Sequence, residues 1–248
     1  MKSLLRHLAR FNQHPWLTSC IVGILIILAT AALGEYKKPQ TTSAPDGETT
    51  TSTATRGGCL NQERQSLTAI APYSHVGQTA STHPTFAWFV PDAENFPLEF
   101  HLEEYTDNSQ LKTIYQQKLS SKPGIMSLSL PQDSPGLTVG QKYRWKIIMR
   151  CTRYRAVVTM AEIEVVAPSS KAKTTLNNIA GTSEQANFLA EMGFWYDALA
   201  MTFYADFQKS KLQSQFIREL AAVEEKNSNS SGVQQQAQRL NVISDRLQ

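Results

Sequence analysis

The residue types used for catalysis occur in this sequence, but their spacing matches no common catalytic or metal-binding motif. The five histidines are scattered, and the patterns HExxH, GxSxG, GxxxxGK and GxGxxG are absent. His101 lies between Glu99 and Glu103 in an alternating segment, which is typical of a salt-bridged histidine on the outer face of a strand. We therefore predict that the protein is not an enzyme and has no catalytic residue, no metal site and no cofactor.

The three cysteines do not have the spacing of a zinc site or of a redox motif. Cys20 lies in an apolar N-terminal segment, so Cys59 and Cys151 are the pair left for an exported domain. Cysteines in an oxidising compartment tend to pair, and we predict a Cys59–Cys151 disulfide, with two separate thiols as the alternative.

Two charged rows are expected on neighbouring strands. They are Arg144, Lys146 and Arg150 on one strand, and Glu99, His101 and Glu103 on the other. Opposite charges on paired strands attract, so these rows are predicted to form a neutralised ladder in preference to a binding patch.

A second basic group follows the end of the predicted strand. It consists of Arg153, Tyr154 and Arg155. These side chains lie beyond the expected ladder, and we therefore regard them as the candidate site for contact with an anionic partner.

The N-terminal residues 1–34 have the pattern of a membrane anchor or a cleaved signal peptide. Lys2, Arg6 and Arg10 precede the uncharged run Leu17–Leu33. This order places the N-terminus in the cytoplasm and delivers the rest of the chain across the membrane. The same three residues account for the formal net charge of +3, so the remainder is neutral and we predict no nucleic-acid binding.

Residues 35–58 are rich in threonine and serine, and Tyr36 is their one large apolar side chain. A segment of this composition cannot bury enough surface to become ordered, so we predict a disordered tether.

Residues 59–168 have the pattern of an antiparallel β-sandwich of the immunoglobulin or fibronectin type III kind, with about seven short strands. The central strand lies within Leu137–Cys151, where Tyr143, Trp145, Ile147 and Met149 alternate with polar residues. The spacing of Leu137, Gly140 and Tyr143 in the same stretch predicts a tyrosine hydroxyl that caps the preceding corner.

After a predicted linker at 169–182, residues 183–226 are expected to be helical, with a capping box formed by Thr182 and Gln185. One stretch resembles the middle of a tetratricopeptide repeat. Its turn and packing positions are Gly193, Trp195, Ala198 and Ala205. A single hairpin cannot form a solenoid core, so it packs on its own domain or, alternatively, forms a peptide-binding groove. Residues 227–248 are predicted to be a frayed polar tail.

Six segments resemble the mostly cyanobacterial family catalogued as domain of unknown function 928. They are TRGGC at Thr55–Cys59, SLTAIAP at Ser66–Pro72, HPTFAWFVP at His83–Pro91, PGIMSLSLP at Pro123–Pro131, LTVGQKYRWKIIMRC at Leu137–Cys151 and AEMGFWYDAL at Ala190–Leu199. The resemblance covers about Thr55 to Phe207 and implies an exported protein in which a sandwich and a helical part are joined. It implies no activity.

These observations predict a protein of the cell envelope, either anchored in the inner membrane and facing the periplasm or released as a secreted or periplasmic protein. We expect its sandwich and helical hairpin to bind a protein partner. The alternative is a binding module for an anionic envelope polymer or polysaccharide, which would use Arg153, Tyr154 and Arg155.

Overall fold

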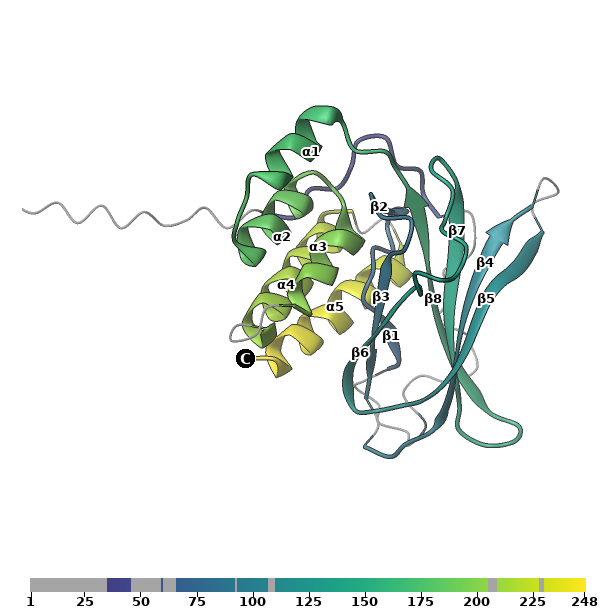
Figure 1. The fold of residues 1–248 in the computed structure, drawn as a ribbon. Coiled ribbons are helices and arrows are strands. Elements are labelled where there is room, and N and C mark those ends of the chain that lie inside the picture. The colour runs from purple at the N-terminus through teal and green to yellow at the C-terminus, as the bar shows by residue number, and fades with distance from the viewer. Residues whose placement is uncertain are drawn as a thin grey trace, which may run out of the picture. The chain divides into compact units, whose positions relative to one another are not determined.

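The structure is a computed structural model that describes residues 35–45, 59, 66–91, 93–106, 110–204, 209–227 and 230–248. Within them the protein has a mixed β and α fold, with eight strands in two sheets and five helices. Figure 1 shows the helices gathered beside the smaller sheet, with the larger sheet on the far side of it. The predicted anchor or signal segment lies outside the described residues.

The smaller sheet has the strand order β1-β3-β6. Its strands are β1 (Thr68–Ala69), β3 (Thr85–Val90) and β6 (Gly124–Ser129). Strand β3 is apolar on both faces because both faces are covered. Phe86 points toward the larger sheet, whereas the ring of Phe89 lies 5.8 Å from the guanidinium of Arg246 in the C-terminal helix.

The larger sheet has the strand order β2-β8-β7-β4-β5. Its strands are β2 (Gly77–Thr79), β4 (Pro97–Tyr105), β5 (Leu111–Ser120), β7 (Lys142–Arg150) and β8 (Ala156–Val165). Neighbouring strands run antiparallel except for β2, which pairs in parallel with β8. The sequence analysis misses β2, because three residues are too few to show alternation.

Strand β7 has the predicted two faces. Tyr143, Trp145, Ile147 and Met149 are all buried. Between the sheets, the ring of Trp145 lies 5.5 Å from that of Phe86, and Phe100 on β4 lies 5.0 Å from Phe86. Aromatic pairs at these separations stabilise a core beyond their buried area, so this cluster holds the two sheets together.

The outer face of β7 carries the predicted ladder. Glu103 accepts hydrogen bonds from Arg144 and Lys146, and Glu99 accepts one from Arg150 at 2.8 Å. Burial raises the pKa of Glu103, but the bonds from Lys146 and Arg144 outweigh burial and hold that pKa below its ordinary value. The basic row of β7 is thus paired within the sheet.

The corner before β7 is closed as the sequence predicts. The Thr138 backbone N–H donates to the Tyr143 hydroxyl at 3.0 Å. Gly140 has a φ of 84°, which glycine adopts without steric cost, and its N–H donates to the Val165 carbonyl.

The helices are α1 (Ser170–Asn177), α2 (Thr182–Glu191), α3 (Trp195–Thr202), α4 (Lys209–Lys226) and α5 (Ser231–Arg246). Helix α1 lies in the predicted linker at 169–182, so that prediction is wrong, and it begins where the Ser169 hydroxyl accepts from the Ala172 N–H. The predicted capping box is also absent. The N-cap of α2 is Gly181, and the Gln185 amide donates to the Ile179 carbonyl.

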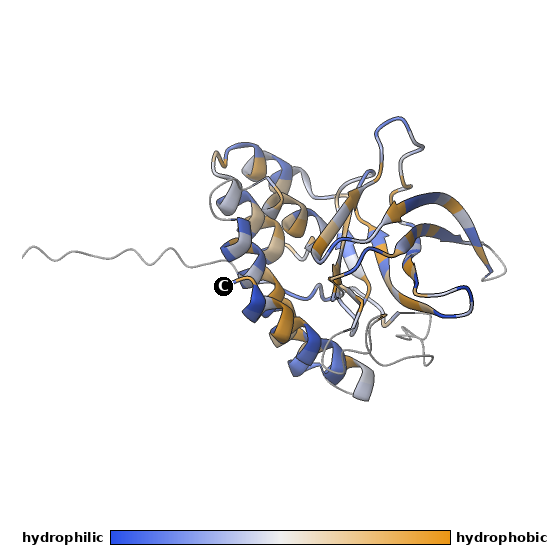
Figure 2. Ribbon diagram, turned by 90° about the horizontal axis from the view of Figure 1, so that it is seen from below, coloured by the Kyte–Doolittle hydropathy of each residue, from blue (hydrophilic) through white to orange (hydrophobic). Residues whose placement is uncertain are grey.

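The predicted frayed tail at 227–248 is instead largely helix α5, packed along α4. Its buried side chains include Val233, Ala237, Leu240 and Ile243, spaced by three and four residues. Figure 2 shows hydrophobic and hydrophilic residues alternating along these helices. The four glutamines of α5 make its composition polar, which hides an apolar stripe of ordinary helical period. No helix among the described residues is both long and apolar enough to span a membrane.

Candidate functional site

The chain between β1 and β3 is the place where the sheets and the helices are joined by polar contacts. We call residues 69–81 the junction segment. Gln236 of α5 donates to the carbonyls of Ala69 at 2.9 Å and Ala71 at 3.3 Å. The indole N–H of Trp195 donates to the Ile70 carbonyl at 3.0 Å. Buried backbone groups need partners, and here helical side chains supply them.

Two carboxylates of the helices bind N–H groups of the junction segment. Asp197 of α3 accepts from the Ala80 N–H at 2.8 Å. Burial raises the pKa of Asp197 to about 6, although its hydrogen bonds act in the opposite direction. Glu224 of α4 accepts from the N–H groups of Tyr73 at 3.1 Å and Ser74 at 2.8 Å. Its side chain is fully buried, and burial raises its pKa in spite of these bonds.

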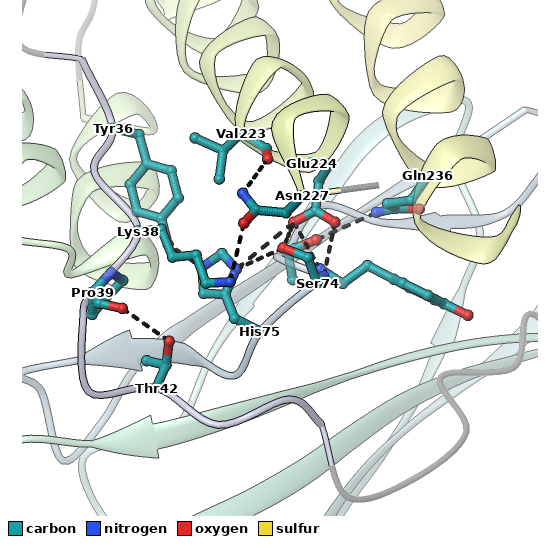
Figure 3. Close-up of polar contacts among 12 residues, drawn as sticks. Tyr36, Lys38, Pro39, Thr42, Ser74, His75, Val223, Glu224, Asn227 and Gln236 are labelled. Atoms are coloured by element: carbon teal, nitrogen blue, oxygen red, sulfur yellow. Dashed lines mark hydrogen bonds and ion pairs between the residues drawn. The ribbon is translucent and has the colours of Figure 1, made fainter. Parts of the chain in front are cut away.

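His75 lies at the centre of the densest polar cluster, which Figure 3 shows. Its Nε2 lies 2.8 Å from the Tyr36 hydroxyl, and its Nδ1 lies 3.0 Å from the Ser74 hydroxyl. The Ser74 hydroxyl also donates to Glu224 at 3.0 Å. A hydroxyl has one proton, so Ser74 accepts from Nδ1–H, and Nε2 accepts from Tyr36. The hydrogen bonds thus assign this tautomer. Each group in this chain donates to the next, from Tyr36 to His75, from His75 to Ser74 and from Ser74 to Glu224.

This chain is closed to solvent. The side chains of His75 and Glu224 have no exposed surface, and Tyr36 is 1% exposed. Burial lowers the pKa of His75 to about 3, and the positive charge of Lys38 lowers it further. The imidazole is therefore neutral at pH 7. A neutral histidine between two hydroxyls has the chemistry of a proton relay, but in this conformation its place inside the protein allows only internal hydrogen bonding.

Tyr36 belongs to a segment that the sequence analysis assigns to the tether. We call residues 35–45 the N-terminal strap. The Tyr36 N–H donates to Glu219 at 3.1 Å, and the Lys37 N–H donates to the Ala190 carbonyl at 3.1 Å. The Val76 N–H donates to the Ser43 carbonyl, and the Tyr36 ring meets Trp195 edge-on at 5.0 Å. This part of the predicted tether is thus packed against the domain, while residues 46–58 lie outside the described residues.

The predicted hairpin positions lie beneath this strap. Gly193 turns the chain between α2 and α3 with a φ of 84°. A side chain there would also meet Pro39, whose Cγ would lie 2.6 Å from an added Cβ. Trp195 and Ala198 are fully buried in α3, which packs on β2 and β3, and Ala205 lies outside the described residues. The hairpin is docked on its own domain.

The predicted cysteine pair is found at the other end of the larger sheet. Cys59 and Cys151 form a disulfide. The turn between β7 and β8, residues 151–155, is here called the basic turn. The side chains of its three candidate residues have different surroundings. Arg155 donates from Nη2 to the Cys59 carbonyl at 2.7 Å, whereas Tyr154 is 90% exposed and the Arg153 guanidinium lies 5.7 Å from its ring centre.

Metal binding has no support in the part of the chain that the structure describes. There, no group of three or more histidine, cysteine, aspartate or glutamate side chains is placed to hold a metal ion. Asp197, Glu219 and Glu224 accept hydrogen bonds from backbone N–H groups instead.

The family model described as Domain of Unknown Function (DUF928) matches residues 51–224. The chain belongs to this family. The DUF928 match takes in both sheets, helices α1 to α3 and most of α4, and it ends at the glutamate that binds the junction segment. No curated protein matches the chain.

Two of the segments that carry the DUF928 resemblance meet at this junction. Ser66–Pro72 contains β1 and the carbonyls bound by Gln236 and Trp195. Ala190–Leu199 contains the α2–α3 turn and Trp195 itself. The sequence analysis finds both segments but misses Tyr36, His75 and Glu224. The one available signal was that Tyr36 is a lone aromatic residue in a polar stretch.

Proposed function

We propose that this DUF928 protein is an exported, non-enzymatic protein of the cell envelope that binds another protein through the basic turn. The observation that carries the proposal is the exposure of Tyr154 and Arg153 on a fixed backbone. Tyrosine and arginine are the residue types most often found at the energetic centres of protein interfaces, together with tryptophan.

The backbone of the basic turn is held in place before any partner arrives. The N–H groups of Cys151 and Thr152 donate to the Arg155 carbonyl at 2.9 and 3.1 Å. The Thr152 hydroxyl accepts from the N–H groups of Tyr154 and Arg155. A preorganised turn loses little conformational entropy on binding, so its side chains contribute more of their contact energy to affinity.

Export is supported by two independent features. The Cys59–Cys151 disulfide is of the kind that persists in oxidising compartments. The sequence adds a basic N-terminus followed by an apolar run, which fits either a retained membrane anchor or a cleaved signal.

We also propose that the two sheets form an immunoglobulin-like sandwich and that α2 and α3 form a tetratricopeptide-like hairpin. The strand orders β1-β3-β6 and β8-β7-β4-β5, with the hydrogen bond from Thr138 to Tyr143, support an immunoglobulin-like sandwich. The left-handed Gly193 and the buried Trp195 and Ala198 support a tetratricopeptide-like hairpin. In sandwiches of this kind the connections at the ends of the sheets commonly bind partners, which is where the basic turn lies.

A non-enzymatic role is supported by the position of the strongest acid–base candidates. His75 and Glu224 face each other across Ser74 inside the protein, and their polar atoms are bonded within the fold. A catalytic group must reach its substrate, and these side chains reach only the strap and the junction segment.

Binding of an anionic polymer is the weaker alternative. It requires both arginines of the basic turn to face outward, but the Arg155 guanidinium donates to the Cys59 carbonyl. Arg153 stacks with the exposed Tyr154, an arrangement that suits a protein surface better than a row of like charges.

The test is capture of a partner by the full-length chain in detergent, using cross-linked envelope extract. The doubly substituted variant Arg153→Ala, Tyr154→Ala is compared with Tyr204→Ala, which removes another exposed tyrosine, 67% exposed, far along the chain. We expect a protein that the native chain and Tyr204→Ala both capture and the double variant loses. Equal capture of a protein by all three chains would overturn the proposal. So would the capture of no protein together with salt-sensitive retention of the native chain on dextran sulfate beads.

A further inference from the structure

Strand β5 forms an outer edge of the larger sheet (Figure 1). Nine of its ten residues have a partner on β4, and on the other side no strand among the described residues pairs with it. An edge strand presents a row of backbone N–H and C=O groups that can pair with another extended chain. This row is selective for extended segments, because only they repeat at the spacing of a strand.

The second half of β5 is the regular half. The register with β4 shifts between Leu102 and Glu103, so Ile114 has no opposite residue and the pairing is even from Tyr115 to Ser120. Tyr115 and Leu119 are half-buried against the core, whereas Gln116 and Lys118 are exposed on the opposite face. A strand added here would place every second side chain beside an apolar rim and the others beside polar groups.

The charge of this region selects among possible partners. Residues 111–129 contain Lys112, Lys118 and Lys122 and no acidic residue. On the β4 side Lys118 lies opposite Glu99 and Lys112 lies opposite Glu104, whereas the open side of β5 faces no acidic residue of its own strand. A second copy of β5 would add more lysines and no carboxylate, so self-pairing is disfavoured. Edge lysines oppose indiscriminate pairing in general, but they attract a strand that carries acidic residues on the matching face.

We propose that the β5 edge binds an extended segment of a partner protein in which apolar and acidic residues alternate. This inference rests on the proposed function, which makes the partner a protein. It adds a second binding surface, the β5 edge, which is separate from the basic turn. Cross-strand pairs of opposite charge contribute about 0.2–1 kcal/mol each, so the charge preference of a single lysine is modest and measurable.

The experiment uses the full-length chain in detergent and labelled peptides of about ten residues, the length of a strand that spans β5. One peptide alternates valine with glutamate, and a second alternates valine with lysine. A third is the glutamate peptide with every second backbone nitrogen methylated, which removes its ability to pair with an edge. Fluorescence polarisation measures binding, and hydrogen exchange locates the backbone amides that become protected.

We expect the valine–glutamate peptide to bind more tightly than the valine–lysine peptide, to protect amides within Tyr115–Ser120, and to lose binding on methylation. Lys118→Glu should weaken binding of the acidic peptide by about two- to fivefold or more, because it removes one favourable pair and puts a like charge in its place. The control Lys171→Glu makes the same change of charge at an exposed position on α1 and should have no effect.

Equal binding of the two charged peptides, survival of binding after methylation, or protection confined to residues outside β5 would each overturn the inference. None of these outcomes involves Arg153 or Tyr154, so failure at the β5 edge is distinguishable from failure of the basic turn as a binding site.

Discussion

The junction segment and the basic turn both gather polar side chains, but the two regions use them in opposite ways. In the junction, both nitrogens of His75 and both carboxylate oxygens of Glu224 are hydrogen-bonded inside the fold. In the basic turn, the backbone is bonded and the side chain of Tyr154 extends into solvent. The contrast shows that the residues with the most reactive chemistry are enclosed in this protein, whereas a tyrosine and an arginine of modest reactivity are exposed to solvent.

The largest difference between the regions should appear when Glu224 is replaced. Glu224→Ala leaves the half-buried N–H groups of Tyr73 and Ser74, and the Ser74 hydroxyl, without their acceptor. Each orphaned group costs about 1–3 kcal/mol, so we expect the free energy of unfolding to fall by about 3 kcal/mol or more. Denaturant unfolding of the full chain measures the change. Its neighbour Glu225, which is exposed, is the control, and Glu225→Ala should cost less than about 0.5 kcal/mol. Similar losses for both variants would mean that the junction is not held by this carboxylate.

The second effect is a dependence of stability on pH. The pKa of His75 is about 3 in the folded protein and about 6.5 in the unfolded chain, so its contribution is present above pH 6.5 and is lost as the pH falls toward 3. Between pH 7 and pH 5 this loss is about 2 kcal/mol. The raised pKa values of Asp197, Glu219 and Glu224 act in the opposite direction, since their folded forms bind protons first on acidification.

The variant His75→Gln isolates this contribution, because glutamine does not titrate. The difference in unfolding free energy between the native chain and His75→Gln should shrink by about 2 kcal/mol from pH 7 to pH 5. A difference that stays constant over this range would show that the imidazole is not held neutral.

A smaller effect is expected at the strap. Tyr36→Phe keeps the ring against Trp195 but removes the hydroxyl that His75 Nε2 accepts from. An unsatisfied buried nitrogen costs about 1–3 kcal/mol, and we expect a loss near the lower end because the ring packing is retained. Hydrogen exchange at Lys37 should become faster as well. Tyr204→Phe serves as the control at an exposed tyrosine. If it lowered the free energy of unfolding as much as Tyr36→Phe does, the buried Tyr36 hydroxyl would have no special role in stability.

The smallest effect on stability is expected at the basic turn. Replacement of Arg153 and Tyr154 by alanine removes exposed side chains and leaves the backbone bonds of the turn intact. The free energy of unfolding should change by less than about 0.5 kcal/mol, as for most surface substitutions. A loss above about 1 kcal/mol would mean that Arg153 and Tyr154 stabilise the fold, as the residues of the junction segment do.

Local sequence patterns were sufficient to predict which residues face the core within a strand or helix, and which charged residues meet on neighbouring strands. The alternation at Tyr143–Met149 predicts the buried face of β7. The ladder on β4 and β7 follows from the same reasoning, because charges on neighbouring strands meet.

The junction could not be predicted in this way. Glu224 and Ser74 are separated by 150 positions, and Trp195 and Ile70 by 125. Glu224 accepts from the Ser74 backbone N–H and Trp195 donates to the Ile70 carbonyl, and every residue carries such backbone groups, so no side-chain pattern marks them. Arg155 shows the same limit on a smaller scale. Its position beyond a strand end indicates an exposed cation, but its partner is a backbone carbonyl 96 positions earlier.

The strap determines what would hold the N-terminal fragment if the chain were cleaved between Pro45 and Cys59. Tyr36 is lodged in the domain before the Thr/Ser-rich stretch, and Cys59 is covalently fixed after it. If a protease severed a bond between Pro45 and Cys59, the disulfide would lie wholly within the longer fragment, and the shorter fragment would be held by the non-covalent contacts of the strap. Release of the shorter fragment would then require Tyr36 to leave its contacts with Trp195 and His75, so a cut chain would report how tightly the strap is bound.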